Sequence, residues 1–361
     1  MTARIPSKSM PVTWRERLAF EIRDHRFRIC DVVLAAAIRG DLEPALDETR
    51  RRLQQEALAA AEGREADIEA VEALMDEFRY AHGLVTVEET EQWLDQFGLT
   101  TDDLSDHFVR RHWRPPAGMF PERVKLSDEA VAGAWAPDLV LSGGFHTFAR
   151  RFAREQVARL LTPKVAGSDP ALVEAFRLAR GIGADAFETW CRNLELGPAM
   201  RDDVLAGQQA MERVRQDLRA PARQAEGLLE IRSRLVRMDL LVAEFDSETA
   251  AQEAYLCVTA DGMSLEAVAA ESGSPLSTRS AAVGAYPESW HPHLAGALPG
   301  RTLHPPSEGG RHCVCRVLDE EEPVLSDPAV ADAVEALLMN RHLGRLEKRE
   351  VRWHVPMGDT A

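Results

Sequence analysis

Apolar residues recur at spacings of three and four along the first two thirds of the chain, as on the buried face of an amphipathic helix. The clearest series consists of Ile68, Val71, Leu74, Met75 and Phe78. Gly83 then predicts a helix end, and Thr86 with Glu89 three residues later forms a capping box that starts the next helix. Between about residues 12 and 233 there is almost no strand pattern, so this region is predicted to be helical.

Two segments of this helical region share an order of residues. The segment from Asp76 reads DEFRYAHGLVTVEETEQWLDQFGL, and the segment from Val173 reads VEAFRLARGIGADAFETWCRNLEL. Each has Phe-Arg, a small residue that ends a helix, a helix with one tryptophan, and a leucine six residues after that tryptophan. Either the two arose by internal duplication, or two helical hairpins of similar size converged on similar patterns.

A further helix is predicted between these segments, from about Phe145 to Leu161. Ser142 would start it, and it would end before Pro163. Its phenylalanines, which include Phe148 and Phe152, either belong to the core or line a groove that binds a guest peptide.

The pattern changes near Leu235, where alternating and continuous apolar runs begin to appear. VRMDLLVAEF predicts a strand, SETAAQEAYLCVTADG a helix that ends at Gly262, and SLEAVAAESG a short helix with Ser264 as N-cap. SPLSTRSAAVGAY predicts a loop that leads to a short strand, PESWHPHLAGALPG a turn and short helix, and GGRHCVCRVLDEEEP a last strand. A final helix, DPAVADAVEALLMNRHLGRLEKREV, starts at Asp327.

Three stretches of this region resemble the parvulin family of peptidyl-prolyl isomerases over about residues 237 to 319. MDLLV resembles the opening strand of the family, normally His-Ile-Leu-Val. SLEAVAAESGSPLSTRSAAVGAY resembles the short helix, active-site loop and Leu-Gly-x-Phe strand, and GGRHCVCRVLDE resembles the closing Gly-x-His-Ile-Ile-x-Val strand. A helical N-terminal module, such a domain and a C-terminal helix together resemble SurA-type chaperones.

The resemblance implies a degenerate catalytic site. The first family histidine falls on Asp239, the Cys or Asp position on Ser274, and the second histidine on His312 or Cys313. We take Asp239, Ser274 and His312 as the catalytic candidates. Alternatively, Asp239 is a surface residue at the start of a strand, and Ser274 is an ordinary turn residue before a proline.

The resemblance also implies an apolar pocket that would hold a proline ring or another side chain of a peptide. The methionine of the family pocket falls on Trp290 and its phenylalanine on Leu294, while the loop glycines fall on Ser280 and Ala281. The peptide-binding candidates in this region are Leu241, Val283, Tyr286, Trp290 and Leu294.

The predicted fold class is α+β, with a mostly helical N-terminal module, a small parvulin-like α/β domain and a C-terminal helix that packs back on the module. Residues 1–115 and 116–235 would form two helical modules, the second a possible repeat of the first. Residues 236–320 would form the parvulin-like domain, and residues 321–361 the C-terminal helix and tail.

Composition and charge restrict the partners. The formal charge of −16 argues against nucleic acid and anionic membranes, and no uninterrupted apolar stretch is long enough for a membrane span. The five cysteines lack a C-x-x-C pair and the N-terminus has no secretory pattern, which predicts reduced thiols in the cytoplasm. His291 and His293 lack further ligands, so neither a metal nor another cofactor is expected.

The expected function is therefore a peptide-binding, chaperone-like protein whose partner is a peptide or an unfolded protein segment. By resemblance, cytoplasmic proteins of this layout hold a precursor peptide for a modifying enzyme in bacterial peptide natural-product biosynthesis. The alternatives are an active prolyl isomerase, which must lower a barrier of about 18–20 kcal/mol, and a scaffold that binds no peptide. The sequence does not decide whether the protein forms a homo-oligomer.

Overall fold

The computed structural model describes residues 11–113, 126–162, 170–179, 181–193, 198–307 and 310–357. The fold is α+β and mostly helical, as predicted, with two small antiparallel sheets. By their internal contacts the residues divide into two compact units. The helical unit comprises Met1–Val214 and His342–Ala361, and the sheet unit comprises Arg215–Arg341.

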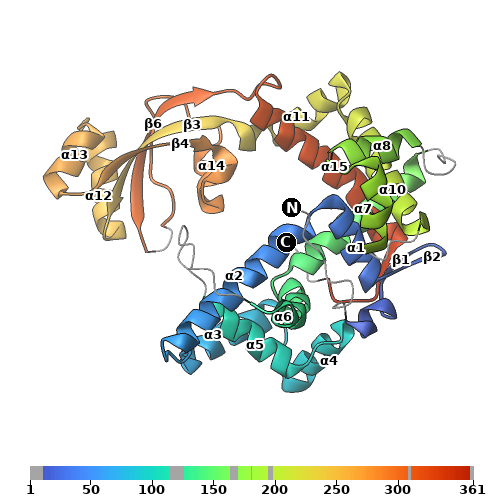
Figure 1. Ribbon diagram of the computed structural model, residues 1–361. Helices are drawn as coiled ribbons and strands as arrows, with labels where there is room; N and C mark the ends of the chain where they lie inside the picture. Colours follow the sequence, from blue (N-terminus) through green and yellow to red (C-terminus); the bar gives the residue numbers. More distant parts are fainter. Residues whose placement is uncertain are drawn as a thin grey trace. The chain divides into compact units, whose positions relative to one another are not determined.

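The helical unit consists mostly of helices (Figure 1), and several of them begin or end at the expected residues. Thr86 and Glu89 form the predicted capping box, and Gly40 and Gly98 end helices in the left-handed conformation. The helices are α1 (Ile29–Arg39), α2 (Leu42–Ala61), α3 (Ile68–Ala81), α4 (Val87–Phe97), α5 (Thr101–His112), α6 (Asp128–Leu141), α7 (Gly144–Leu161), α8 (Pro170–Ala179), α9 (Ala184–Asn193) and, shared with the sheet unit, α10 (Pro198–Leu218).

The turns that join α3 to α4 and α8 to α9 make similar local contacts. Gly83 has φ 66° in the first turn and Gly181 has φ 62° in the second. Arg79 donates to the backbone oxygen of the residue six positions on, and Arg177 donates to that of the residue five positions on, both at 2.9 Å. These shared contacts support an internal duplication of the two hairpins, which stays a proposal.

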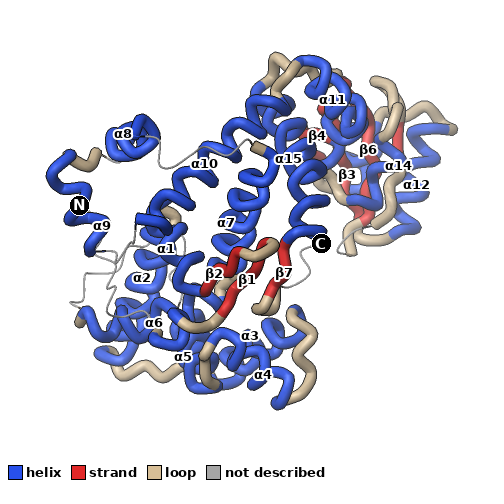
Figure 2. The backbone as a smooth tube through the Cα atoms, turned by 90° about the vertical axis from the view of Figure 1, so that its right-hand side faces the viewer, coloured by secondary structure: helices blue, strands red, loops and turns tan. Residues whose placement is uncertain are grey.

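A three-stranded sheet lies in the region that was predicted to be helical throughout. It is ordered β2-β1-β7, with β1 (Leu18–Ile22), β2 (His25–Arg28) and β7 (Val351–Trp353), which run side by side in Figure 2. The prediction was wrong here because strands of three to five residues show little alternation, and β1 finds one of its two partners at the other end of the sequence. By this pairing the C-terminal end of the chain returns to the helical unit, as expected.

The phenylalanines of α7 lie in the core of the helical unit. Phe145 and Phe152 are fully buried, and Phe148 is 9% exposed. Phe152 packs edge-on against Phe20 of β1 and Phe27 of β2, with ring centroids 5.8 and 5.2 Å apart. A guest peptide could contact Phe148 and Phe152 only if these rings left the core.

The sheet unit contains a four-stranded antiparallel sheet ordered β4-β3-β6-β5. The strands are β3 (Arg237–Phe245), β4 (Leu276–Ala282), β5 (Thr302–Leu303) and β6 (His312–Glu321). The helices are α11 (Pro221–Leu235), α12 (Glu248–Thr259), α13 (Leu265–Ser272), α14 (His291–Leu294) and, shared with the helical unit, α15 (Pro328–Glu350). Among the described residues no helix is long and apolar enough to cross a bilayer.

The strand β4, which lies between α13 and α14 in the sequence, begins earlier than predicted. LSTRSAA, which was expected to be part of a loop, forms β4 and pairs with β3 from Arg237↔Ala282 to Ala243↔Leu276. Val283–Ala285, which was expected to be strand, forms a 3-10 turn instead. The polar side chains of β4 gave no strand signal because it is an edge strand with mostly exposed residues.

Alternation along the central strands gives the sheet two buried faces (Figure 1). On one face, Leu241, Ala243 and Phe245 of β3 pack against α12 and α13. The other face is covered by the 3-10 turn and α14, and includes Met238, Leu240, Val242, Val283, Tyr286, Trp290, Leu294, Cys313, Cys315 and Val317.

The helix α11 is held against α15 by a close approach at a glycine. A Cβ added to Gly227 would lie 2.8 Å from Cγ1 of Val334 and 3.1 Å from Cγ of Leu338. The ion pairs Arg341–Glu230 (2.7 Å) and Arg219–Glu335 (2.6 Å) lie beside this contact. One face of α11 also lines a cavity.

We expect Gly227→Ala to destabilise the protein by about 1–2 kcal/mol, because the overpacking outweighs the gain in helix propensity. Gly344→Ala is the matched control, since Gly344 lies in α15 with nothing within 4 Å of an added Cβ. The free energy of unfolding of that variant should rise by about 0.5–1 kcal/mol, because alanine has the higher helix propensity. Urea unfolding measures both, and an equal effect of the two substitutions would contradict the close approach.

Candidate functional site

A cavity of about 350 Å³ lies within the sheet unit. Its volume is in the range of pockets that bind small ligands or single side chains of a peptide. The lining residues come from α11, β3, β6 and the segment around α14: Leu229, Arg232, Ser233, Val236, Met238, Val283, Leu294, Ala295, Gly296, Glu320 and Glu322.

The apolar part of the lining is fixed by the fold around the end of α11. Met238 of β3 is fully buried, and Leu294 of α14 is 1% exposed, so both form the inner part of the lining. Val283 follows β4 directly, and its backbone N–H donates to the oxygen of Val236 at 2.8 Å. By contrast, Leu229 of α11 is 73% exposed and lies at the open side.

Two aromatic residues support this lining from behind. The rings of Tyr286 and Trp290 stack with centroids 6.1 Å apart, and both residues are buried. The Tyr286 hydroxyl donates to the backbone oxygen of Met238 at 3.1 Å, and the indole N–H of Trp290 donates to that of Pro306 at 3.2 Å. Burial raises the pKa of Tyr286, so its hydroxyl stays a neutral donor.

The polar part of the lining consists of an ion pair, one further carboxylate and Ser233. Arg232 donates two hydrogen bonds to Glu322, from Nε to Oε2 at 2.9 Å and from Nη2 to Oε1 at 2.7 Å. This bond lowers the pKa of Glu322 and raises that of Arg232. Glu320 lines the same cavity and interacts with Arg232 through space, but its carboxylate forms no direct ion pair among the described residues.

The structure does not bring the three catalytic candidates together. His312 pairs with Phe245 at the end of β3, and the backbone N–H of the preceding Glu244 donates to the oxygen of Pro275, next to Ser274. Asp239 lies six residues back along β3, which corresponds to about 20 Å. Asp239 therefore lies at the opposite end of β3 from the segment that pairs with His312 and contacts Pro275.

Asp239 instead faces another acid across the sheet. Its partner in β6 is Asp319, and its partner in β4 is Ser280. Ser274 accepts a hydrogen bond from Ser272 at 2.8 Å, after the end of α13. These are the strand-start and turn positions that the simpler alternatives assigned to Asp239 and Ser274.

The peptide-binding candidates divide between the two faces of the sheet. Val283 and Leu294 line the cavity, and Tyr286 and Trp290 support it from the same face. Leu241 points to the opposite face, among α12 and α13, because side chains alternate along β3.

The contribution of α11 was missed in the sequence. Leu229, Arg232, Ser233 and Val236 are spaced by three, one and three residues, which places them on one side of a helix. This spacing was visible, but the helix was assigned to the preceding module rather than to the domain that follows it. Glu320 and Glu322, at the end of β6, were also missed.

The strand β4 is an open edge of the sheet. It pairs with β3 on one side, and on its other side no strand pairs with it among the described residues. An edge of this kind can pair with an added strand through backbone N–H and C=O groups. Since β4 ends at Ala282 and the cavity residue Val283 follows, the edge leads to the cavity.

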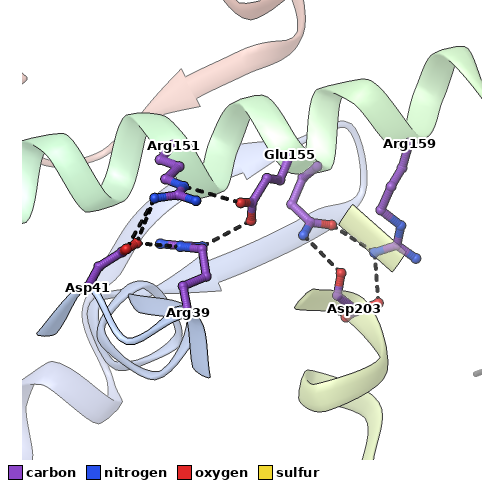
Figure 3. Close-up of polar contacts among 7 residues, drawn as sticks. Arg39, Asp41, Arg151, Glu155, Arg159 and Asp203 are labelled. Carbon is purple, nitrogen blue, oxygen red and sulfur yellow. Dashed lines mark hydrogen bonds and ion pairs between the residues drawn. The ribbon is translucent and has the colours of Figure 1, made fainter. Parts of the chain in front are cut away.

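A second polar cluster lies inside the helical unit, along α7 (Figure 3). Glu155 accepts a hydrogen bond from Arg39 at 2.9 Å and is 3.6 Å from Arg151, and both arginines also bind Asp41. The side chains of Arg39 and Glu155 are 2% and 3% exposed. The cluster joins α1, the start of α2 and α7, so its role is structural.

We expect this cluster to make stability depend on pH. Burial raises the pKa of Glu155 to about 7, against the lowering effect of the arginines. The folded state therefore retains a proton that the unfolded chain releases, and the free energy of unfolding falls as pH rises from about 4.5 to 7. The expected loss is about 2–3 kcal/mol at most.

Denaturant unfolding at several pH values measures this effect. Glu155→Gln, which cannot ionise, should flatten the profile over this window. Asp47→Asn is the control, since Asp47 is 63% exposed in its pair with Arg50 and should leave the profile unchanged. If the Gln variant keeps the full slope, the pH dependence does not come from Glu155.

The described residues contain no group of three or more His, Cys, Asp or Glu side chains that could hold a metal ion. Burial raises the pKa of Cys313 and of Cys315, so both are packed thiols rather than reactive ones.

Comparisons with known proteins give distant structural likenesses. No family model matches the chain, and no curated protein matches it. The peptidylprolyl isomerase PrsA from Bacillus anthracis has a TM-score of 0.31 and 12% identity, and the match covers 56% of this chain and 96% of that one. The foldase protein PrsA from Lactococcus lactis has a TM-score of 0.23 and 11% identity, with 58% and 84% covered. At these low values, function must be argued from the geometry of the chain itself.

Proposed function

We propose that the protein binds extended peptide segments of other proteins at the cavity of the sheet unit, as a chaperone does. The observation that carries this proposal is the cavity of about 350 Å³, partly lined by apolar residues, beside an open strand edge. An added strand would gain backbone hydrogen bonds from β4, and one of its side chains would enter the cavity.

The binding energy would come from two sources. Burial of a leucine-sized side chain contributes about 1.5–3 kcal/mol. Backbone hydrogen bonds along β4 add contributions that do not depend on the sequence of the peptide. Such a site binds many segments weakly, which suits the holding of unfolded chains. A precursor peptide held for a modifying enzyme would be one client of this kind.

Isomerisation is not part of the proposal. Catalysis needs groups that favour the twisted amide over the planar one. The polar side chains at the cavity are an ion pair, a glutamate and a serine, while Asp239, Ser274 and His312 do not line it.

An exposed residue of the lining allows a test that does not endanger folding. Leu229 is 73% exposed and lines the cavity, whereas Leu298 is 67% exposed and lies outside the lining. We expect Leu229→Asp to weaken the binding of a fluorescein-labelled, unstructured peptide with spaced leucines by about tenfold or more. Leu298→Asp, the matched control, should bind as the unmodified protein does.

Fluorescence anisotropy measures the affinity, and circular dichroism checks that both variants are folded. Equal losses in the two variants, or no saturable binding by the unmodified protein, would contradict a peptide site at this cavity.

A further inference from the structure

The cavity carries an excess of negative charge. Of its three charged residues, Arg232 and Glu322 neutralise each other through their two hydrogen bonds. Glu320 therefore leaves a net negative charge beside the apolar lining. The excess is local, because Glu320 belongs to the segment Asp-Glu-Glu-Glu at the end of β6.

The register of the sheet fixes on which side the Glu320 carboxylate lies. Glu320 pairs with Met238, and paired residues of antiparallel strands point to the same face. Because Met238 belongs to the cavity lining, so does the Glu320 side chain, and the residue is half-buried. Its backbone N–H donates to Oδ1 of Asp319 at 2.9 Å. Its carboxylate interacts with Arg232 through space but forms no direct ion pair among the described residues, because Arg232 is bound to Glu322.

We propose that the segment bound at this cavity carries a lysine or arginine two residues from the apolar side chain that enters it, since side chains two apart in a strand point to the same face. The proposal rests on the proposed function and specifies its ligand. A partly desolvated carboxylate favours a cation from the ligand, because charges interact more strongly there than in bulk water. The long stem of lysine or arginine can lie along the apolar lining while its charge reaches Glu320.

The charge also selects among occupants. A second copy of this chain, at a formal charge of −16, would bring a predominantly acidic surface to an acidic site. An acidic peptide would meet Glu320 and Glu322 directly. A basic segment of another polypeptide is the occupant whose charge complements the cavity.

The test uses the full-length protein and three labelled peptides that are identical except at one position, two residues from the central leucine. That position holds Lys, Gln or Glu. We expect affinity to fall from Lys to Gln to Glu, by about three- to tenfold over the series, and the preference to weaken with added salt. Glu320→Gln should remove the difference between the Lys and Glu peptides, and Glu320→Lys should reverse it.

Glu253→Lys is the control, because Glu253 is exposed on α12, against the other face of the sheet, and should leave the order unchanged. If the unmodified protein binds all three peptides equally, the charge preference is wrong and the peptide site remains. If it binds none of them, the proposed function itself fails. Self-association that Leu229→Asp abolishes would make a second copy the occupant and would also overturn the proposal.

Discussion

Asp138→Ala should destabilise the protein by about 3–5 kcal/mol, because it leaves a buried guanidinium without its carboxylate. One oxygen of Asp138 accepts hydrogen bonds from Nδ1 of His107 at 2.8 Å and from Arg110 at 2.9 and 3.2 Å. The side chains of Arg110 and Asp138 are 7% and 3% exposed. Burial alone would raise the pKa of Asp138, but these two partners bring it below its ordinary value, so the carboxylate is charged.

Guanidinium chloride unfolding measures the loss. Asp76→Ala is the matched control, since Asp76 also pairs with an arginine but is 56% exposed, and it should cost less than about 1 kcal/mol. Adding Arg110→Met to the Asp138→Ala variant should recover much of the loss, because the unpaired charge is then gone. If Asp138→Ala costs no more than Asp76→Ala, the buried network does not hold α5 to α6.

Removal of residues 351–361 should destabilise the helical unit by about 3 kcal/mol or more, because it uncovers a fully buried phenylalanine. The ring of Trp353 in β7 lies 5.2 Å from that of Phe20 in β1. The next residue, His354, donates its backbone N–H to Ala19 at 2.9 Å and lies 3.2 Å from Glu21. These contacts join the two ends of the chain.

A point variant isolates the aromatic contact. Trp353→Ala should reproduce most of the loss, whereas Arg352→Ala, on the exposed side of β7, should cost little. Thermal unfolding followed by circular dichroism compares them with the unmodified protein. Equal melting temperatures for Trp353→Ala and Arg352→Ala would show that β7 does not cover the core.

The helices of this protein could be predicted because their signals are local. Thr86 with Glu89, Gly83, and the series from Ile68 to Phe78 each act within a few residues, and the structure has the helices they indicate. The strands β1 and β7 escaped prediction because their pairing depends on residues more than 300 positions apart. Such pairing leaves no periodic signal in either segment.

The site was predicted in part, for a similar reason. Val283 and Leu294 were found by their resemblance to a family pocket, and both line the cavity. Alignment could not show that His312 of β6 pairs with the end of β3 that lies far from Asp239, because that depends on the register between the two strands. Nor could it show that α11 turns one face toward the sheet.

The most direct test of the peptide site observes the cavity itself. Of the ten methionines, Met238 lines the cavity, while Met263 packs on the opposite face of the sheet with α12 and α13. With ¹³C-labelled methionine methyl groups, titration with the leucine- and lysine-containing peptide should shift the Met238 signal saturably and leave that of Met263 in place. A peptide that binds without moving the Met238 signal, or that moves only Met263, would contradict a peptide site at this cavity.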